Sequence, residues 1–293
     1  MSGRDPGETA ADAAGRATAR DSLSETLRVN LMAIAARARV RVLASWRETS
    51  WVVGETVFPF LTMSAFVLVY RGLHAPKVYE AFVVLGAAMT AYWNNVLWSM
   101  ASQFFWEKEV GQLQLYLITP VSRMTILLGM ALGGMAMTTT RAVAILLGGT
   151  LLFHVAIPAG KILPALGLFL LTLAAVYALG MILSSLFLLW GRSAWHTVTL
   201  LQEPVYLLSG FYFPVRFLGA IVGGLAALLP ITLGLDGIRQ IFYGQAARGF
   251  VPVAWIAPIE VLLFAVFLFL AHKALHLMEG LGKREGRLTL RGT

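Results

Sequence analysis

The sequence predicts an all-α membrane protein with six transmembrane helices, on the basis of its composition, its apolar runs and the distribution of its positive charges. Of its 293 residues, 58% are hydrophobic and 13% are charged, which leaves too little polar surface to cover a soluble protein of this size. The chain also contains charge-free apolar runs of about 20 residues, the length that crosses a hydrocarbon core about 30 Å thick. We therefore expect the chain to lie in a bilayer.

The charge balance and the lack of cysteine narrow the functional classes. Lys and Arg together number 23, against 15 for Asp and Glu. In an apolar chain this excess predicts a defined topology and contact with anionic lipid rather than nucleic-acid binding. Zero cysteines exclude disulfides, thiolate metal sites and a cysteine nucleophile.

The first 50 residues divide into a tail and a helix. Residues 1–21 are rich in Ala, Gly, Arg and Asp and lack the apolar core of a signal peptide, so they predict a disordered cytoplasmic tail. Residues 22–50 predict an amphipathic helix, because Ser22 and Glu25 have capping-box spacing and an apolar stripe follows them. Such a helix suits the inner membrane surface; the alternative is a cytoplasmic helix packed on a partner. The stripe consists of Leu27, Leu31, Ile34, Ala38, Val42 and Trp46.

Residues 51–275 form the predicted six-span transmembrane domain. A seventh apolar run, residues 217–235, is interrupted by glycines and by Pro230. This interruption favours a re-entrant hairpin over residues 214–245, which enters and leaves the membrane by its outer face. The six predicted spans cover roughly residues 51–70, 81–105, 124–155, 162–190, 194–213 and 253–275.

The positions of Lys and Arg favour six spans over seven. Six spans place most of the basic side chains on the cytoplasmic side, including the basic tail at residues 276–293. Seven spans divide them more evenly between the two sides, against the positive-inside rule. Both termini are therefore predicted to be cytoplasmic.

The sequence lacks the residues with which a transporter would hydrolyse its own nucleotide. A phosphate-binding loop ends in Gly-Lys-Ser/Thr, but the two Gly-Lys pairs in this chain are followed by Ile162 and Arg284, which have no hydroxyl for Mg²⁺. His272, His276 and Glu279 form only a faint metal-site pattern, with no further ligand. We therefore expect no catalytic residue, no metal site and no cofactor in this chain.

The loop between the second and third predicted spans, residues 105–123, is charged at its start and apolar in its middle. Val110, Leu113 and Leu117 recur at three and four residues, and Pro120 ends the element. One or two helical turns here would expose an apolar ridge to the cytoplasm, which fits a groove in another protein. The alternative is a helix that lies flat at the lipid headgroups.

Three stretches of the sequence resemble the membrane subunits of type-2 ATP-binding-cassette (ABC) exporters, in the daunorubicin-resistance and nodulation-export group. Residues 107–123, with their Glu-x-Glu-x-Gly start and Thr-Pro-Val-Ser-Arg end, resemble the coupling segment of that family. The Ser-Gly-Phe-Tyr-Phe-Pro run at 209–214 resembles the end of its fifth span, and Pro230 with the Asp-Gly-Ile-Arg run at 236–239 resembles its outer hairpin. Gln114 departs from the glutamate common in the family, which puts one contact with the ATPase in doubt.

The resemblance covers about residues 27–275 and implies a permease subunit for outward transport of an amphiphilic substrate, drug-like or lipid-linked. It implies a coupling helix at 107–122, two ATPase subunits that hold ATP and Mg²⁺, and a second permease subunit, identical or homologous. The implied location is the cytoplasmic membrane of a bacterium or archaeon. A polysaccharide or glycolipid export permease, a proton-coupled secondary transporter using Glu203, and an intramembrane enzyme or assembly factor are the alternatives.

Within the coupling segment, the resemblance implies contacts with the ATPase. Two acidic side chains would pair with basic residues of the partner, apolar side chains would fill its groove, and a glycine would permit close backbone approach. In chain order the predicted coupling residues are Glu107, Glu109, Val110, Gly111, Leu113, Leu117, Pro120 and Arg123.

Polar groups inside the spans are costly to bury and therefore suggest a function. Glu203, which precedes a proline in the fifth span, is either part of a substrate route or a structural carboxyl. Arg141 in the third span is either the partner of Glu203 or a structural residue. Asn94 and Asn95 either hydrogen-bond between helices or line that route. The predicted route comprises Asn94, Asn95, Trp98, Glu203, Tyr206 and Tyr212. An outer gate is predicted at Gly210, Phe213, Pro214, Asp236 and Arg239.

Overall fold

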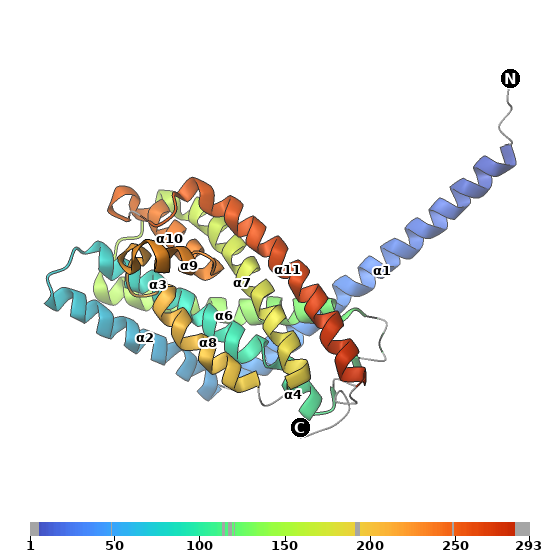
Figure 1. Cartoon of the computed structure of the whole chain (residues 1–293), viewed down its shortest axis with the longest axis horizontal. Helices are drawn as coiled ribbons and strands as arrows, with labels where there is room; N and C mark the ends of the chain where they lie inside the picture. The colour runs from blue at the N-terminus through green and yellow to red at the C-terminus, as the bar shows by residue number, and fades with distance from the viewer. Residues whose placement is uncertain are drawn as a thin grey trace.

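The computed structural model describes residues 6–47, 49–112, 115–116, 119, 121–190, 194–247 and 249–284. These residues form helices and short connections, and no strand occurs among them (Figure 1). The elements are, in chain order, α1 (Pro6–Arg47), α2 (Thr49–Gly72), α3 (Val78–Asn94), the π-helix η1 (Asn95–Met100), α4 (Gln103–Glu109), α6 (Arg123–Phe153), η2 (Ala159–Lys161), α7 (Ile162–Trp190), α8 (Ala194–Leu208), η4 (Val215–Leu218), α9 (Gly219–Ala226), α10 (Pro230–Tyr243), η5 (Gly244–Ala247) and α11 (Val253–Arg284).

Within the described residues, four helices are long and apolar enough to cross a membrane. They contain Val52–Gly72, Arg123–Phe153, Ala159–Phe187 and Val253–Leu277, and they correspond to the first, third, fourth and sixth predicted spans. The second predicted span is divided between α3 and the π-helix η1. The fifth corresponds to α8, whose 15 residues are about 22 Å long. The chain is therefore an all-helical multi-pass membrane protein.

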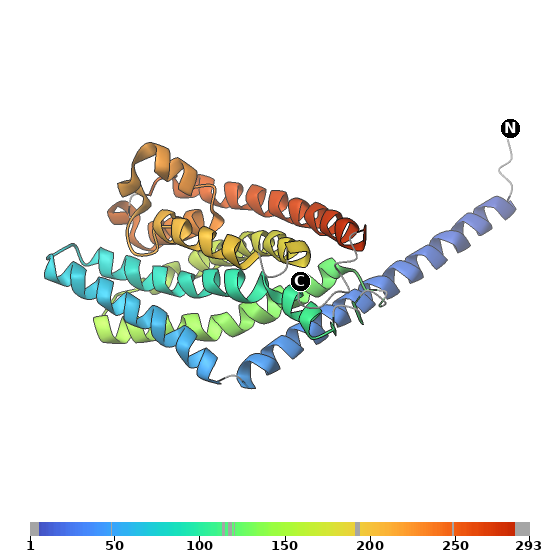
Figure 2. The same ribbon diagram turned by 60° about the horizontal axis from the view of Figure 1, so that its bottom comes forward.

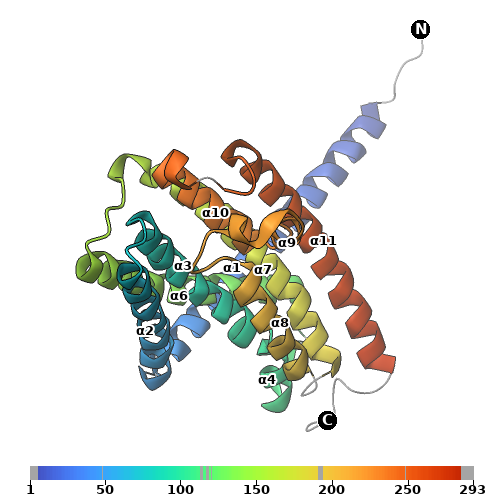
Figure 3. The ribbon, with the colours of Figure 1, turned by 60° about the vertical axis from the view of Figure 1, so that its left-hand side comes forward.

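Helix α3 is the centre of the bundle. Every residue from Glu80 to Trp93 is buried, which is typical of a helix that is surrounded by other helices rather than exposed on one face. In Figure 3, α3 and α7 lie between α2 on one side and α11 on the other. Helix α10 packs against both α3 and α7. The core therefore lies along α3 and the inner face of α7.

Helix α1 is longer than the sequence predicts. It begins at Pro6, so residues 6–21, for which the composition predicts a disordered tail, are helical. Alanine, arginine and glutamate in this stretch are good helix formers, which accounts for the extension. At its other end α1 stops at Arg47, close to the expected boundary. Figure 2 shows that the N-terminal part of α1 projects away from the bundle.

The C-terminal half of α1 packs closely on α6 at two glycines one turn apart. A Cβ atom on Gly129 would lie 2.8 Å from the Cβ atom of Arg37, and one on Gly133 would lie 2.8 Å from the carbonyl oxygen of Ala38. Small residues spaced four apart let helix backbones approach closely. Ala38 of the predicted apolar stripe therefore packs on α6. Leu27 and Leu31 of the same stripe are exposed.

Between α8 and α11 the chain forms a cluster of short helices. Helix α9 has 8 residues and α10 has 14, so both are shorter than the about 20 residues that cross the hydrocarbon core. Leu229 is extended and Pro230 begins α10, where a missing N–H is tolerated. The break that the sequence predicts at Pro230 is thus a turn between two short helices.

We expect Gly129→Ala to lower the free energy of unfolding by about 1–3 kcal/mol, because the added methyl group overpacks the contact with α1. Thermal unfolding in detergent measures the change. Gly167→Ala in α7 is the control, because a Cβ atom there meets nothing within 4 Å. Equal stability of both variants would contradict the close packing of α1 on α6.

Candidate functional site

The candidate site has two parts, one at the start of the predicted coupling segment and one at the predicted outer gate. Of the coupling residues, Leu113, Leu117 and Pro120 lie outside the described residues, as does Gln114. Residue 118 is also outside them, and the described residues of the segment show how it is held to the rest of the chain.

Glycine is required at position 111 by the backbone. Helix α4 ends at Glu109, and Gly111 has a φ of +78°, in the left-handed region that favours glycine. The N–H of Gly111 donates to the carbonyl oxygen of Lys108 at 3.0 Å. The expected role of Gly111 was a close approach to a partner, but the geometry gives it a role in turning the chain after α4.

Glu107 is buried inside this chain and forms an ion pair with Arg37 of α1. Gln103 donates to the same carboxylate at 2.9 Å, and Arg41 donates to the Gln103 side-chain oxygen at 2.8 Å. The expectation that Glu107 pairs with the ATPase is therefore corrected, because its carboxylate is buried and directed toward Arg37 and Gln103 of this chain. Its Oε2 atom has no hydrogen-bond partner among the described residues. Sequence reasoning missed Arg37 because its position on α1, off the apolar stripe, predicts only a solvated charge.

Arg37 contacts both ends of the described part of the segment. Besides its ion pair with Glu107, its guanidinium lies 5.5 Å from the centre of the Tyr116 ring, within the range of a cation–π interaction. Burial raises the pKa of the Tyr116 hydroxyl, and the Arg37 charge acts in the opposite direction. Arg37 therefore fastens the coupling segment to α1.

Apolar side chains remain exposed on the segment. Trp106 and Val110 lie one turn apart, with exposed fractions of 53% and 64%, and Leu115 is also exposed. At the end of the segment, the Ser122 hydroxyl accepts a hydrogen bond from the N–H of Thr125 at 3.1 Å and caps α6. Arg123 is the first residue of α6. The motif thus ends in a helix cap, next to an exposed apolar surface.

The polar residues of the second predicted span bind neighbouring helices. Asn94 accepts a hydrogen bond from the Tyr206 hydroxyl at 2.9 Å, and Asn95 accepts one from the Tyr177 hydroxyl at 2.9 Å. The Trp98 indole donates to the Gln202 side chain at 2.8 Å. Of the two roles expected for the asparagines, this geometry favours hydrogen bonding between helices. Tyr177 and Gln202 were missed because one polar side chain in an apolar helix does not indicate its partner.

The remaining route residues, Tyr212 and Glu203, lie in different surroundings. The ring of Tyr212 stacks on Phe66 with centroids 4.5 Å apart. Glu203 is exposed on the surface of α8. Arg141 forms an ion pair with Glu55 of α2, so the alternative in which it pairs with Glu203 is wrong. Arg141 therefore joins α6 to α2, in the structural role that was the other alternative.

At the predicted outer gate, Arg239 is almost fully buried among backbone carbonyl groups. It donates to the carbonyl oxygens of Phe82 at 2.7 Å and of Gly210 and Phe211 at 2.8 Å, and more weakly to that of Phe213 at 3.4 Å. The guanidinium also lies 4.7 Å from the centre of the Phe82 ring. One side chain of α10 therefore holds α3 and the turn that follows α8.

The turn at 209–214 fits this arrangement closely. Gly210 has a φ of +64°, which favours glycine. On α3, Gly86 has no side chain, so the carbonyl group of Phe211 can approach the helix backbone. Pro214 is buried and precedes η4. These contacts give the Ser-Gly-Phe-Tyr-Phe-Pro run a structural purpose that the motif alone does not reveal.

Asp236 organises a different connection from the one that Arg239 holds. Its carboxylate accepts hydrogen bonds from the N–H of Phe250 at 3.0 Å and from the Gln240 side chain at 3.1 Å. Gln240 also donates to the carbonyl oxygen of Val251 at 2.7 Å. Asp236 therefore fixes the approach to α11, whereas Arg239 fixes the turn after α8.

The described residues contain no group of three or more His, Asp or Glu side chains that could hold a metal ion. His272 and His276 lie with their ring centres 4.5 Å apart, but no described third ligand joins them. The site therefore consists of ion pairs, hydrogen bonds and apolar surfaces, which can transmit movement and bind partners.

We expect Arg239→Gln to lower the free energy of unfolding by at least about 2 kcal/mol, because it leaves several buried carbonyl groups without a donor. Amide hydrogen exchange should also increase at residues 209–213. Arg216→Gln, at an exposed site nearby, should change the free energy of unfolding by less than about 0.5 kcal/mol. Unchanged exchange at 209–213 in Arg239→Gln would show that Arg239 does not hold this turn in place.

Comparisons with known proteins agree with this architecture. A search of curated proteins gave no match to this chain. A family model described as ABC-2 type transporter matches residues 32–243, which extend from α1 through α10 and include both parts of the candidate site. This match covers more than half of the chain, and the chain therefore belongs to the ABC-2 type transporter family of membrane transport subunits, which work with an ABC ATPase partner.

Proposed function

We propose that this chain is the permease subunit of an ABC exporter that moves an amphiphilic substrate, drug-like or lipid-linked, out of the cytoplasm. ATP hydrolysis takes place on two copies of a separate ATPase subunit, and a second permease subunit, identical or homologous, completes the complex. The observation that carries this proposal is the family match together with the exposed apolar side chains beside the Gly111 turn. The family match does not select the substrate class; an amphiphile fits the apolar helices of this chain better than a highly charged solute.

The proposed ATPase contact is the exposed surface of the coupling segment. Trp106 of α4 and Val110, the residue directly after this helix, are exposed although both are apolar. Exposed aromatic and aliphatic anchors of this kind are typical of protein interfaces. Glu109 lies on the same segment and remains a candidate to pair with a basic residue of the ATPase.

The geometry also supports a path for mechanical coupling. Arg37 fastens the coupling segment to α1 through Glu107 and Tyr116. Helix α1 in turn packs on α6 at Gly129 and Gly133. A rigid displacement of the segment by the ATPase would therefore move α1 and α6 together, as in other switches in which packed helices shift as units.

The proposed membrane topology has six spans and both termini in the cytoplasm. In this arrangement α3 with η1 is the second span, α8 is the fifth, and α9 and α10 form the re-entrant hairpin. The short α8 is extended by the turn at 209–214, whose carbonyl groups are satisfied by Arg239. Irregular backbone is tolerated at membrane depth where protein satisfies its polar groups.

The position of Glu203 supports a second permease subunit. Its carboxylate is exposed on the surface of α8 between apolar neighbours such as Leu200 and Leu207, which are also exposed. A charged side chain facing lipid is costly, so such residues normally face a protein partner or a water-filled route. We therefore place the second permease and the substrate route against this face of α8. A proton-coupled transporter built on a Glu203–Arg141 pair is not supported, because Arg141 pairs with Glu55.

To test the ATPase contact, the tagged chain is expressed in its native cell, and the amount of ABC ATPase that copurifies with it is measured. Val110→Asp should reduce copurification by at least about tenfold, because a charge replaces an apolar anchor in the contact. Leu277→Asp is the control, since Leu277 is also an exposed apolar residue, near the end of α11. Normal copurification with Val110→Asp would remove this surface from the ATPase contact.

To test the route, export and assembly are measured separately for Glu203→Gln. We expect export or substrate-stimulated ATP hydrolysis to fall by about tenfold or more while both subunits still copurify, because the side chain contacts the route rather than the core. Glu25→Gln, on the exposed surface of α1, should leave both measurements unchanged. If export by Glu203→Gln equals that of the wild type, Glu203 does not belong to the route.

A further inference from the structure

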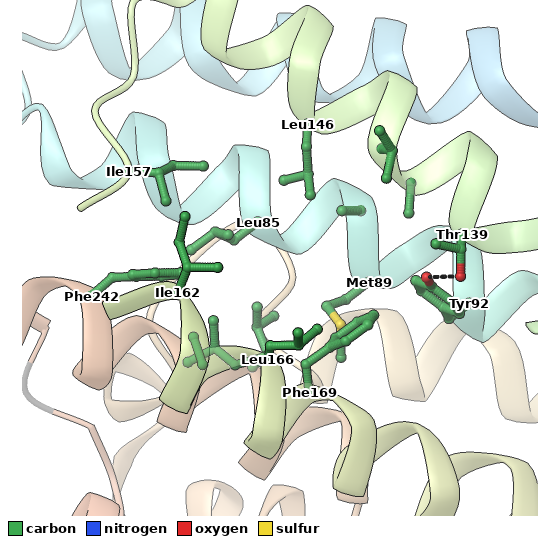
Figure 4. Close-up of a pocket in the computed structure, with 16 residues that line it drawn as sticks. Leu85, Met89, Tyr92, Thr139, Leu146, Ile157, Ile162, Leu166, Phe169 and Phe242 are labelled. Carbon is green, nitrogen blue, oxygen red and sulfur yellow. Dashed lines mark hydrogen bonds between the residues drawn. The ribbon is translucent and has the colours of Figure 1, made fainter. Parts of the chain in front are cut away.

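An apolar slot lies between α6 and α7, with α3 and α10 behind it. The slot has a volume of about 330 Å³, at the lower end of the range for ligand pockets. Figure 4 shows side chains from these four helices pointing into one space, with Leu146 on one side and Leu166 on the other. At one end, Tyr92 and Thr139 form a hydrogen bond of 2.8 Å with each other, which satisfies the hydroxyl groups. The lining therefore offers a ligand almost only carbon atoms.

The slot opens at the surface of this chain, between two helices that are long and apolar enough to cross a membrane. Val143 on α6 and Leu166 on α7 both line the slot and are both partly exposed. The opposite wall is closed, because Leu85 and Met89 of α3 are buried. A cavity with such a lining does not hold ordered water, and an empty one would forfeit dispersion contacts along its whole length. Inside a membrane, a hydrocarbon chain is the ligand that fills it.

A second cavity, of about 780 Å³, lies at the N-terminal end of α3. We call it the polar cavity because charged side chains are part of its lining. Its lining includes Arg71, Lys77, Glu80 and His154. Arg71 pairs with Glu80 at 2.8 Å and donates to the carbonyl oxygen of Phe153 at 2.8 Å, so its guanidinium is held in place. Lys77 is exposed and adds a second positive charge. The balance of charge in this cavity is positive, which favours an anionic group.

The two cavities adjoin each other. Ala81 lines the polar cavity and Leu85, one turn further along α3, lines the slot. On the facing side, Ala156 lines the polar cavity and its neighbour Ile157 lines the slot. The Tyr243 hydroxyl donates to the carbonyl oxygen of Ala156 at 3.0 Å and braces this junction. A molecule with a charged head and an apolar tail would therefore span both cavities.

We propose that this pair of cavities binds an anionic phospholipid, with one acyl chain in the slot and the phosphate group near Lys77 and Arg71. The occupant is a membrane phospholipid rather than free phosphate, because the apolar slot, which only a hydrocarbon chain would fill, adjoins the positive cavity. The proposed topology places this site in the outer leaflet, and this placement is the only part of the inference that rests on the proposed function. It is separate from the exposed face of α8 that we assign to the substrate route.

The acyl part is tested with the full chain, purified with its partners and incubated with vesicles of equal parts phosphatidylglycerol and phosphatidylcholine. After extraction in mild detergent, retained lipid is counted by native mass spectrometry. Val143→Phe should reduce the retained phospholipid by about tenfold, because the ring fills the mouth of the slot and displaces several methylene groups. Ala165→Leu fills the slot from α7 and should have a similar effect. Leu147→Phe, one turn along α6 on an exposed surface outside the slot, should retain lipid like the wild type.

The headgroup part is tested by the ratio of the two lipids in the same samples. The wild type should retain phosphatidylglycerol in preference to phosphatidylcholine. Lys77→Gln should reduce this preference by about threefold, as expected for one exposed ion pair. Arg216→Gln removes a positive charge outside the cavity and should leave the preference unchanged. Inorganic phosphate added in excess should not displace the lipid, because it makes no contact with the slot.

Several outcomes would overturn the proposal. Equal lipid retention by Val143→Phe, Ala165→Leu and Leu147→Phe would mean that the lipid is only part of the surrounding annulus. Equal retention of both lipids by the wild type would refute the anionic headgroup site, as would displacement by inorganic phosphate. Failure of ATPase copurification in the wild type would contradict the proposed exporter and leave the lipid measurements valid, so the two proposals fail independently.

Discussion

The burial of the Arg239 guanidinium among backbone carbonyl groups is the interaction on which the packing of α10, α3 and the turn after α8 depends. A charge that is removed from solvent must be compensated, and here the carbonyl oxygens come from α3 and from the turn after α8. The turn cannot move away from α3 without leaving both the charge and its acceptors unpaired. In this way a single side chain satisfies the backbone of a short, irregular connection, as non-helical segments of membrane proteins require.

The contact between α1 and α4 is organised by a second arginine, the half-buried Arg37. It connects α1 to α4 by its ion pair with Glu107, and the glycines of α6 bring α1 close enough for this contact. Glu107 is thus directed into the chain, whereas Trp106, Val110 and Leu115 are exposed. The described part of the segment therefore has two faces: one is fastened to α1 of this chain, and the other is exposed.

The features that the sequence predicted well are local ones. Long apolar runs identified α2, α6, α7 and α11, because the length and composition of a helix depend only on its own residues. Partners distant in the chain could not be predicted, because periodicity indicates which face of a helix is apolar but not which helix lies against it. Arg37 with Glu107 and Arg141 with Glu55 are of this kind. The interruption of the second span by η1 is also a property of its packing, since its residues alone read as one continuous apolar run.

The slot between α6 and α7 also affects how these helices can move. Aliphatic side chains slide past one another with small barriers, and the hydrogen bond at the end of the slot joins α3 to α6 rather than α6 to α7. Relative displacement of α6 and α7 along the slot therefore breaks no polar contact of its lining. A hydrocarbon chain held there would keep the contact between α6 and α7 apolar and deformable. The lipid composition of the surrounding membrane would then influence how easily these two helices move relative to each other.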